Sequence, residues 1–187
     1  EVFQLFTRSP RGGTKPLVKS EVASFKECCT QLGYSRWYVH APYVMNLAAA
    51  DGPKADYSRD LIITELERAQ TLDAQAVVTH LGSATGRSHE QGLGQVVKAL
   101  GQIQAAYKGP VELLLEISAG AGEIIGASFE EIAAILDGVD ADKSLAQKMN
   151  VCFDTQHAFG SGYDLRDAEA VDATFAKFDK LIGLQRL

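Results

Sequence analysis

The chain has 187 residues, of which 46% are hydrophobic, and carries a formal net charge of −6. This length and composition suffice for one well-buried domain, and no Pro- or Ser-rich tract divides the sequence, so a single domain over residues 1–187 is expected. The acidic balance excludes a protein that grips nucleic acid over its whole surface, because such binding depends largely on Lys and Arg displacing counterions from phosphates.

The sequence shows no signal for secretion or membrane insertion. No apolar run reaches the roughly 18 residues that cross a bilayer, and the first ten residues lack the basic start of a signal peptide. The three cysteines, Cys28, Cys29 and Cys152, form neither an even secreted framework nor a CxxC pair. We therefore expect a soluble, cytoplasmic protein without disulfides or membrane contact.

Short β-rich runs alternate with amphipathic helical stretches along the chain, which is the pattern of successive βα units and a parallel sheet. Most of the strand candidates are nearly continuous apolar runs, as expected for strands that are covered on both faces. In chain order the five candidates lie at residues 2–7, 36–41, 74–82, 111–118 and 150–156.

Between the strand candidates, apolar residues recur at helical spacing, most clearly over residues 93–103 and 129–139. Each of these stripes can pack on a sheet. Ser128 followed by Glu131 predicts a capping box at the start of a helix, and Ser58 and Asp167 are candidate N-caps of two others.

Five βα units in a row predict a parallel β/α barrel of the TIM type, here an incomplete one. A complete barrel needs eight units and typically about 250 residues, and an open run of five leaves unpaired sheet edges. We therefore expect an internal piece of a barrel. A self-contained, doubly wound sheet of five strands is the alternative.

Four consecutive strand candidates each end in a residue type that binds metals. In parallel β/α folds the chemistry lies at the carboxyl ends of the strands. A lone His or acid after a strand is more often a hydrogen-bonded loop or core group, but four strands that follow one rule are harder to assign to chance. The residues are His40, His80, Glu116 and Asp154, with His157 three residues beyond Asp154.

The chemistry of this set favours zinc or manganese, because imidazole nitrogens are mixed with carboxylate oxygens, whereas an all-oxygen set would favour magnesium or calcium. Glu116 is the candidate for a carboxylate that bridges two ions, and we assign it as the catalytic residue. Ions roughly 3.5 to 4 Å apart can stabilise the attacking and the leaving oxygen of a phosphodiester displacement. The set therefore predicts a polynuclear hydrolytic site.

A basic segment near the N-terminus is the candidate for local contact with nucleic acid. It contains Arg8, Arg11, Lys15 and Lys19, with no acidic residue before Glu21. Charge alone also fits an ordinary solvated loop, so this segment needs support from neighbouring residues.

Several segments resemble endonuclease IV, the family of zinc-dependent abasic-site endonucleases. The similarity is collinear over nearly the whole chain, and its most specific part is the last segment, which is close to the family's DTCHAFAAGYD-type signature. The segments are LFTRSPR, VHAPYVMNLA, THLGSATG, LLEISAGAGEIIG, IAAILDGV and CFDTQHAFGSGYDLR.

The resemblance implies a barrel that carries three zinc ions. It assigns His40 and His80 to one zinc and Glu116 to a bridge between this zinc and a second. Asp154 matches a ligand of the second ion, and His157 a ligand of the third. The family's zinc cluster activates the nucleophile that attacks the phosphorus on the 5′ side of the lesion, which leaves a 3′-hydroxyl and a 5′-deoxyribose phosphate.

The resemblance also implies a partner, double-stranded DNA with abasic sites, and a protein that we expect to be a monomer. The family bends this DNA and flips out the abasic nucleotide while side chains fill the gap in the stack. Arg11, Tyr43 and Val44 occupy the matching positions here. A guanidinium, an aromatic ring and an aliphatic side chain are suited to wedge between bases and offset the cost of unstacking.

The chain departs from the family at four positions near the matched residues, but none of them replaces a matched zinc ligand. Leu81 stands for the usual Pro, Ala84 for a His, Ile117 for an Asn and Gln156 for a Cys. Ile117 and Gln156 are expected to change the groups that support the ligands. The resemblance further implies that the first strand and a ligand-bearing C-terminal part lie outside this chain, and that the isolated piece is inactive.

Two other functions fit some of the same residues. A sugar isomerase or epimerase on a related barrel would also place Glu, Asp and His at strand ends and bind manganese or magnesium, and fold alone does not separate it from a nuclease. A non-catalytic DNA-binding module descended from a nuclease is a third interpretation, which the five matched ligands disfavour. The segments around Arg11 and Tyr43 favour DNA.

Overall fold

The computed structural model describes residues 1–10, 13, 15–142 and 149–187, and its five strands form one parallel sheet. The strands follow one another across the sheet in the order β1-β2-β3-β4-β5. All five strand candidates are confirmed, each with a shorter hydrogen-bonded part than the apolar run. The strands are β1 (Val2–Leu5), β2 (Arg36–His40), β3 (Ala76–Thr79), β4 (Glu112–Glu116) and β5 (Asn150–Cys152).

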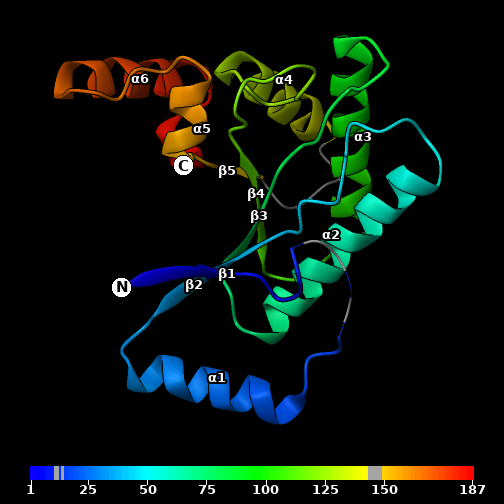
Figure 1. Cartoon of the computed structure of the whole chain (residues 1–187), viewed down its shortest axis with the longest axis vertical. Helices are drawn as coiled ribbons and strands as arrows, with labels where there is room; N and C mark the ends of the chain where they lie inside the picture. Colours follow the sequence, from blue (N-terminus) through cyan, green and yellow to red (C-terminus); the bar gives the residue numbers. More distant parts are fainter. Residues whose placement is uncertain (11–12, 14, 143–148) are drawn as a thin grey trace.

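Helices connect the strands and follow one another around the sheet, from α1 at the bottom of Figure 1 to α6 at its upper left. They are α1 (Lys19–Gln31), α2 (Pro53–Thr71), α3 (His89–Ala106), α4 (Phe129–Asp140), α5 (Thr155–Gly160) and α6 (Ala168–Leu181), followed by the short 3₁₀ turn η1 (Leu184–Arg186). Within the described ranges, no helix combines the length and the apolar character that a membrane crossing needs.

The strand order is that of a β/α barrel, because a doubly wound sheet reverses its order at a switch point. The core lies where α2, α3 and α4 cover the sheet, and every residue of β3 is buried. The predicted stripe of α3 faces this core through Val96, Leu100 and Ile103, which are at most 1% exposed. Burying an aliphatic side chain of this size stabilises the fold by about 1.5–3 kcal/mol.

The helix caps differ in part from the prediction. The Ser128 hydroxyl accepts a hydrogen bond from the Glu131 N–H at 3.2 Å, so the cap of α4 is confirmed. The Glu131 carboxylate, however, accepts hydrogen bonds from the N–H groups of Gly126 and Ala127 rather than from that of Ser128. It therefore stabilises the turn before α4. A complete capping box forms instead at the start of α3.

Of the two other predicted caps, Asp167 is confirmed and Ser58 is wrong. Asp167 accepts a hydrogen bond from the Ala170 N–H at 2.9 Å and caps α6. Ser58 lies inside α2, which begins at Pro53, because Pro is well suited to the first turn of a helix. Its hydroxyl accepts a hydrogen bond from the main chain of Asn46, so Ser58 holds a loop rather than a helix end.

Candidate metal centre

The carboxyl ends of four neighbouring strands bring the predicted ligands to one edge of the sheet. His40 is the last residue of β2, His80 follows β3 directly, and Glu116 is the last residue of β4. Asp154 lies two residues beyond β5, where it caps the short helix α5 that carries His157. Because the strands are parallel and adjacent, side chains from distant parts of the sequence meet here.

The Glu116 carboxylate lies at the middle of this cluster. Its Oε2 is 3.0 Å from Nε2 of His40 and 2.9 Å from Nε2 of His80. Its Oε1 is 3.3 Å from Nδ1 of His157. The two oxygens of one carboxylate therefore face different imidazoles, which is the arrangement that a bridge between two ions requires.

Two groups of possible ligands share this carboxylate. His40, His80 and Glu116 form the first, and Glu116, Asp154 and His157 form the second. In each group the ligand atoms lie within 4.8 Å of one another. Nitrogen and carboxylate oxygen donors at such spacing fit zinc or manganese, the two metals that the residue types in the sequence favour.

The ionisation of the cluster reflects burial and mutual hydrogen bonding. Burial raises the pKa of Glu116, but hydrogen bonds from His40 and His80 outweigh it and bring this pKa down to about 2. Burial lowers the pKa of His40, yet its hydrogen bonds to Glu116 and to the Ala41 carbonyl leave that pKa raised. Burial raises the pKa of the nearby Cys152 thiol to about 12, so this group is neutral.

Main-chain carbonyls orient two of the imidazoles. Nδ1 of His40 lies 2.6 Å from the Ala41 carbonyl oxygen, and Nδ1 of His157 lies 3.0 Å from that of Ile117. In His40, an Nδ1–H that donates to this carbonyl leaves Nε2, the nitrogen that faces Glu116, for a metal ion. The support expected to change at Ile117 therefore comes from its main chain, because its side chain is buried in the apolar core.

Packing accounts for two of the other three departures from the family pattern. Leu81 and Ala84 are buried in the core. A Cβ on Gly92 of α3 would stand 2.5 Å from the Ala84 Cβ, so this pair of small residues lets the loop after β3 lie close to the helix. Gln156 is exposed, and neither Ala84 nor Gln156 belongs to the two ligand groups found among the described residues.

Two of the three predicted DNA contacts lie at the mouth of the centre. Tyr43 is 58% exposed and Val44 is 40% exposed, so both side chains are accessible from outside. The Tyr43 ring centroid lies 5.4 Å from that of His40 and 5.5 Å from that of His80. Exposed apolar side chains beside a polar cluster are suited to contact a partner. Arg11 lies outside the described residues.

The basic segment contributes less surface charge than its sequence indicates. The Arg8 side chain is 4% exposed and forms an ion pair with the fully buried Glu65 of α2. Thr7 donates a hydrogen bond to the same carboxylate, and Arg68 donates to Thr7. Arg8 is therefore part of the internal packing, and it adds no exposed charge to the candidate basic segment.

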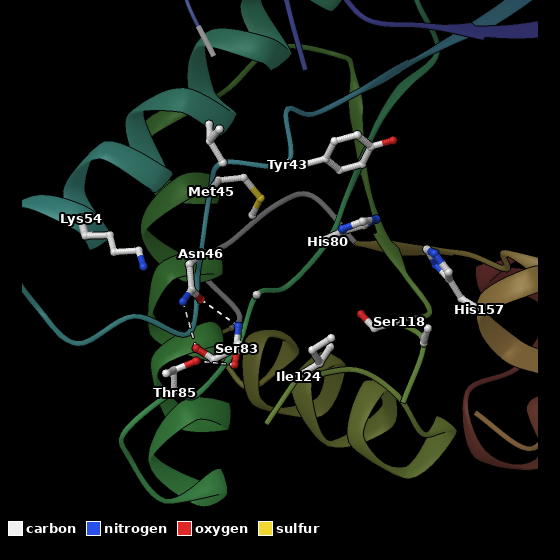
Figure 2. A pocket seen from close by; sticks show the side chains of 13 residues that line it. Tyr43, Met45, Asn46, Lys54, His80, Ser83, Thr85, Ser118, Ile124 and His157 are labelled. Atoms are coloured by element: carbon white, nitrogen blue, oxygen red, sulfur yellow. Dashed lines mark hydrogen bonds between the residues drawn. The ribbon is translucent and has the colours of Figure 1, made fainter. Parts of the chain in front are cut away.

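A cavity of about 440 Å³ opens beside the cluster and is lined by His80, His157 and Tyr43, together with residues that sequence reasoning missed (Figure 2). One of these is Asn46, which follows Tyr43 by three residues. Its Oδ1 accepts hydrogen bonds from the N–H groups of Ala48 and Ser83, both at 3.0 Å, and its Nδ2 donates to the Ser83 carbonyl. Asn46 thus ties the loop after β2 to the loop after β3.

Gly82 allows the Asn46 side chain to come this close to the loop after β3. Its φ is +94°, and a Cβ at this position would stand 2.0 Å from Oδ1 of Asn46. Only glycine accepts both the backbone conformation and the close approach. The sequence signals for these contacts between the loops are Asn46 in VMNLA and Gly82, two residues after His80. They can be interpreted only once the two loops are known to be adjacent.

The fold and the cluster define a parallel β/α barrel with a candidate metal centre, and residues 1–185 match the family described as xylose isomerase-like TIM barrel, to which this chain belongs. The predicted fold class, an incomplete barrel of five βα units, is confirmed. The resemblance to endonuclease IV is confirmed as well. A probable endonuclease 4 from Natronomonas pharaonis is 36% identical over 185 residues, which are 98% of this chain and 64% of that protein.

Two further comparisons agree. A probable endonuclease 4 from Nitrosopumilus maritimus is 37% identical over 188 residues, covering 99% of this chain and 66% of the relative. The crystal structure of endonuclease IV from Thermus thermophilus superposes with a TM-score of 0.79 at 34% identity and covers all of this chain and 64% of that one. The chain thus spans about two thirds of the length of these proteins.

Proposed function

We propose that this protein is a DNA-repair endonuclease that hydrolyses the phosphodiester on the 5′ side of abasic sites with a multinuclear zinc centre. The observation that carries the proposal is the position of Glu116, whose two carboxylate oxygens face two groups of imidazole and carboxylate donors. The names of the relatives, which are endonucleases 4, support the same reaction.

Zinc, when bound, would act as a Lewis acid that activates the nucleophile and stabilises charge on the phosphate oxygens. His40 and His80 would hold one ion, with Glu116 bridging to a second ion that Asp154 also binds and His157 serving a third. The Ala41 and Ile117 carbonyl groups would hold the imidazole rings of His40 and His157 in place. The protein's own part is thus to preorganise the donors before metal and substrate arrive.

Tyr43 and Val44 would contact the DNA at the mouth of the centre. Both are exposed, and the Tyr43 ring lies beside the imidazoles of His40 and His80. A side chain there can fill the gap that a flipped nucleotide leaves in the base stack, while the flipped group enters the adjacent cavity. Arg11 is proposed for the same role from its motif position.

The ligand count sets what the 187-residue chain can do. A zinc ion takes three or four protein ligands, so these five side chains, divided among three ions, leave at most one zinc position nearly complete. We therefore expect the chain alone to bind zinc and abasic DNA but not to cut. A version extended to a full barrel is expected to cut.

The test is an incision assay on a labelled abasic duplex, with the chain, the barrel-completed version and its Glu116→Gln variant. The completed version should leave a 3′-hydroxyl and a 5′-deoxyribose phosphate, and Glu116→Gln should lose at least about a hundredfold in rate, because the bridge is removed. Strong cutting by the chain alone would contradict the ligand count. Turnover of a free ketose without any incision would establish the sugar epimerase alternative.

A further inference from the structure

Ser118 carries a buried hydroxyl without a hydrogen-bond partner in the described part of the chain. The residue lies two positions after Glu116 and is 4% exposed, and its Oγ has no partner. Its main chain, in contrast, is fully paired: its N–H donates to the Gly126 carbonyl at 2.9 Å, and its carbonyl accepts from Oγ of Ser161 at 2.7 Å. The turn is therefore held without the Ser118 hydroxyl.

This hydroxyl belongs to the wall of the cavity beside the metal centre. Figure 2 shows its oxygen turned toward the cavity, on the side where the imidazoles of His80 and His157 lie. A buried hydroxyl that makes no hydrogen bond costs free energy, and an alanine would avoid this cost. A position that carries the cost in the free protein is suited to bind something in the complex.

The charges around the cavity indicate what that ligand is. Among the described residues, its lining includes Lys54, His80 and His157 and no carboxylate, although the whole chain has a net charge of −6. The Lys54 side chain reaches toward the cavity from α2, and no ion pair of its ammonium occurs among the described residues (Figure 2). One ammonium group together with hydroxyl donors matches an anion with several oxygens.

We propose that Oγ of Ser118 donates a hydrogen bond to a phosphate oxygen of the ligand in this cavity and thereby positions the phosphate beside the five clustered side chains. Ser118 is a substrate-contacting residue in addition to the predicted ligands and wedge residues. The identification of the phosphate as one of DNA rests on the proposed function, whereas the hydrogen bond to a phosphate oxygen does not.

The test compares the wild-type chain with Ser118→Ala and with Ser35→Ala, a control that removes an exposed hydroxyl outside the cavity. Inorganic phosphate is titrated calorimetrically into each protein at saturating zinc, and an abasic duplex and an intact duplex are titrated by fluorescence anisotropy. One hydrogen bond to a charged oxygen corresponds to about a tenfold change in affinity. Ser118→Ala should thus weaken phosphate and abasic duplex about tenfold, and Ser35→Ala neither.

A second readout separates ligand contact from a structural role. Because the hydroxyl is unpartnered in the free protein, Ser118→Ala should leave the ligand-free melting temperature unchanged or raise it, and zinc content should stay at the wild-type level. A lower melting temperature would show that the hydroxyl supports the fold, and it would overturn the proposal.

The measured affinities test the Ser118 contact and the proposed nuclease function separately. If Ser118→Ala weakens phosphate binding while the wild type shows no preference for abasic over intact duplex, the Ser118 contact holds and the nuclease proposal fails. If the wild type prefers the abasic duplex and Ser118→Ala binds phosphate and duplex as tightly, the contact is overturned and the nuclease proposal stands. A wild-type chain that binds neither phosphate nor duplex overturns both.

Discussion

At the scale of single residues, the candidate centre depends on one carboxylate whose two oxygens face different imidazoles. Glu116 is buried, and its oxygens separate His40 and His80 on one side from His157 on the other. An aspartate would be shorter by one methylene and would not reach both sides from the end of β4. The choice of glutamate at this strand end is therefore a geometric requirement as well as a chemical one.

The exposed aromatic ring at the mouth leads to a prediction about DNA affinity. Tyr43→Ala should weaken binding of an abasic duplex by about 1–3 kcal/mol, which is the usual contribution of stacking between a base and an aromatic side chain. Tyr57→Ala is the matched control, because Tyr57 is 49% exposed on α2 but does not line the cavity. Anisotropy titrations at fixed salt measure both, and equal losses in the two variants would contradict a wedge role for Tyr43.

The residues that sequence reasoning found and missed differ in kind. His40, His80, Glu116 and Asp154 follow a positional rule that can be read along one strand at a time. Ser118 carries no such signal, because its importance comes from the absence of a partner in three dimensions. The sequence also gives no sign that Arg8 is buried. Its ion pair with Glu65, 57 positions away along the chain, removes it from the surface.

At the scale of elements, the loops after β2 and β3 are held together by side chains rather than by their own turns. The Asn46 side chain makes two hydrogen bonds that join them, both to the main chain of Ser83, and a third to Ala48 in its own loop, while Ser58 of α2 holds the Asn46 main chain from the other side. These loops carry Tyr43 and His80, so the same contacts position the mouth of the centre. The mistaken N-cap at Ser58 shows how a residue type suited to capping can serve a loop instead.

Loss of this tie should be measurable as stability. Asn46→Ala should lower the free energy of unfolding by about 1–3 kcal/mol, because partly buried main-chain groups of Ala48 and Ser83 lose their partners. Asn150→Ala, which removes one exposed hydrogen bond to Glu112, should cost clearly less. Urea unfolding followed by circular dichroism gives both values, and similar losses would show that the loops hold together without Asn46.

At the scale of the whole molecule, the sequence predicts the architecture well because the information is periodic. Apolar runs and helical stripes place five strands and the helices between them, and the sequential strand order follows from their alternation. Periodicity does not show which loops meet above the sheet. That depends on side-chain contacts such as the one between Asn46 and Gly82, which no local pattern encodes.

The candidate ligands converge from the ends of β2, β3 and β4 and from α5, so metal binding would be a property of the folded molecule, because the unfolded chain does not bring them together. A ligand bound only by the native state stabilises it by about 2.7 kcal/mol at a concentration one hundred times its Kd. For a chain of this size that corresponds to a rise in Tm of roughly 5–11 °C. Differential scanning fluorimetry with and without zinc should show this rise, and His80→Gln should remove most of it.

His89→Gln is the control, because His89 is exposed at the start of α3 and pairs with Glu131 away from the ligand groups. An equal rise in wild type and His80→Gln would mean that zinc stabilises the protein somewhere other than at the Glu116 cluster.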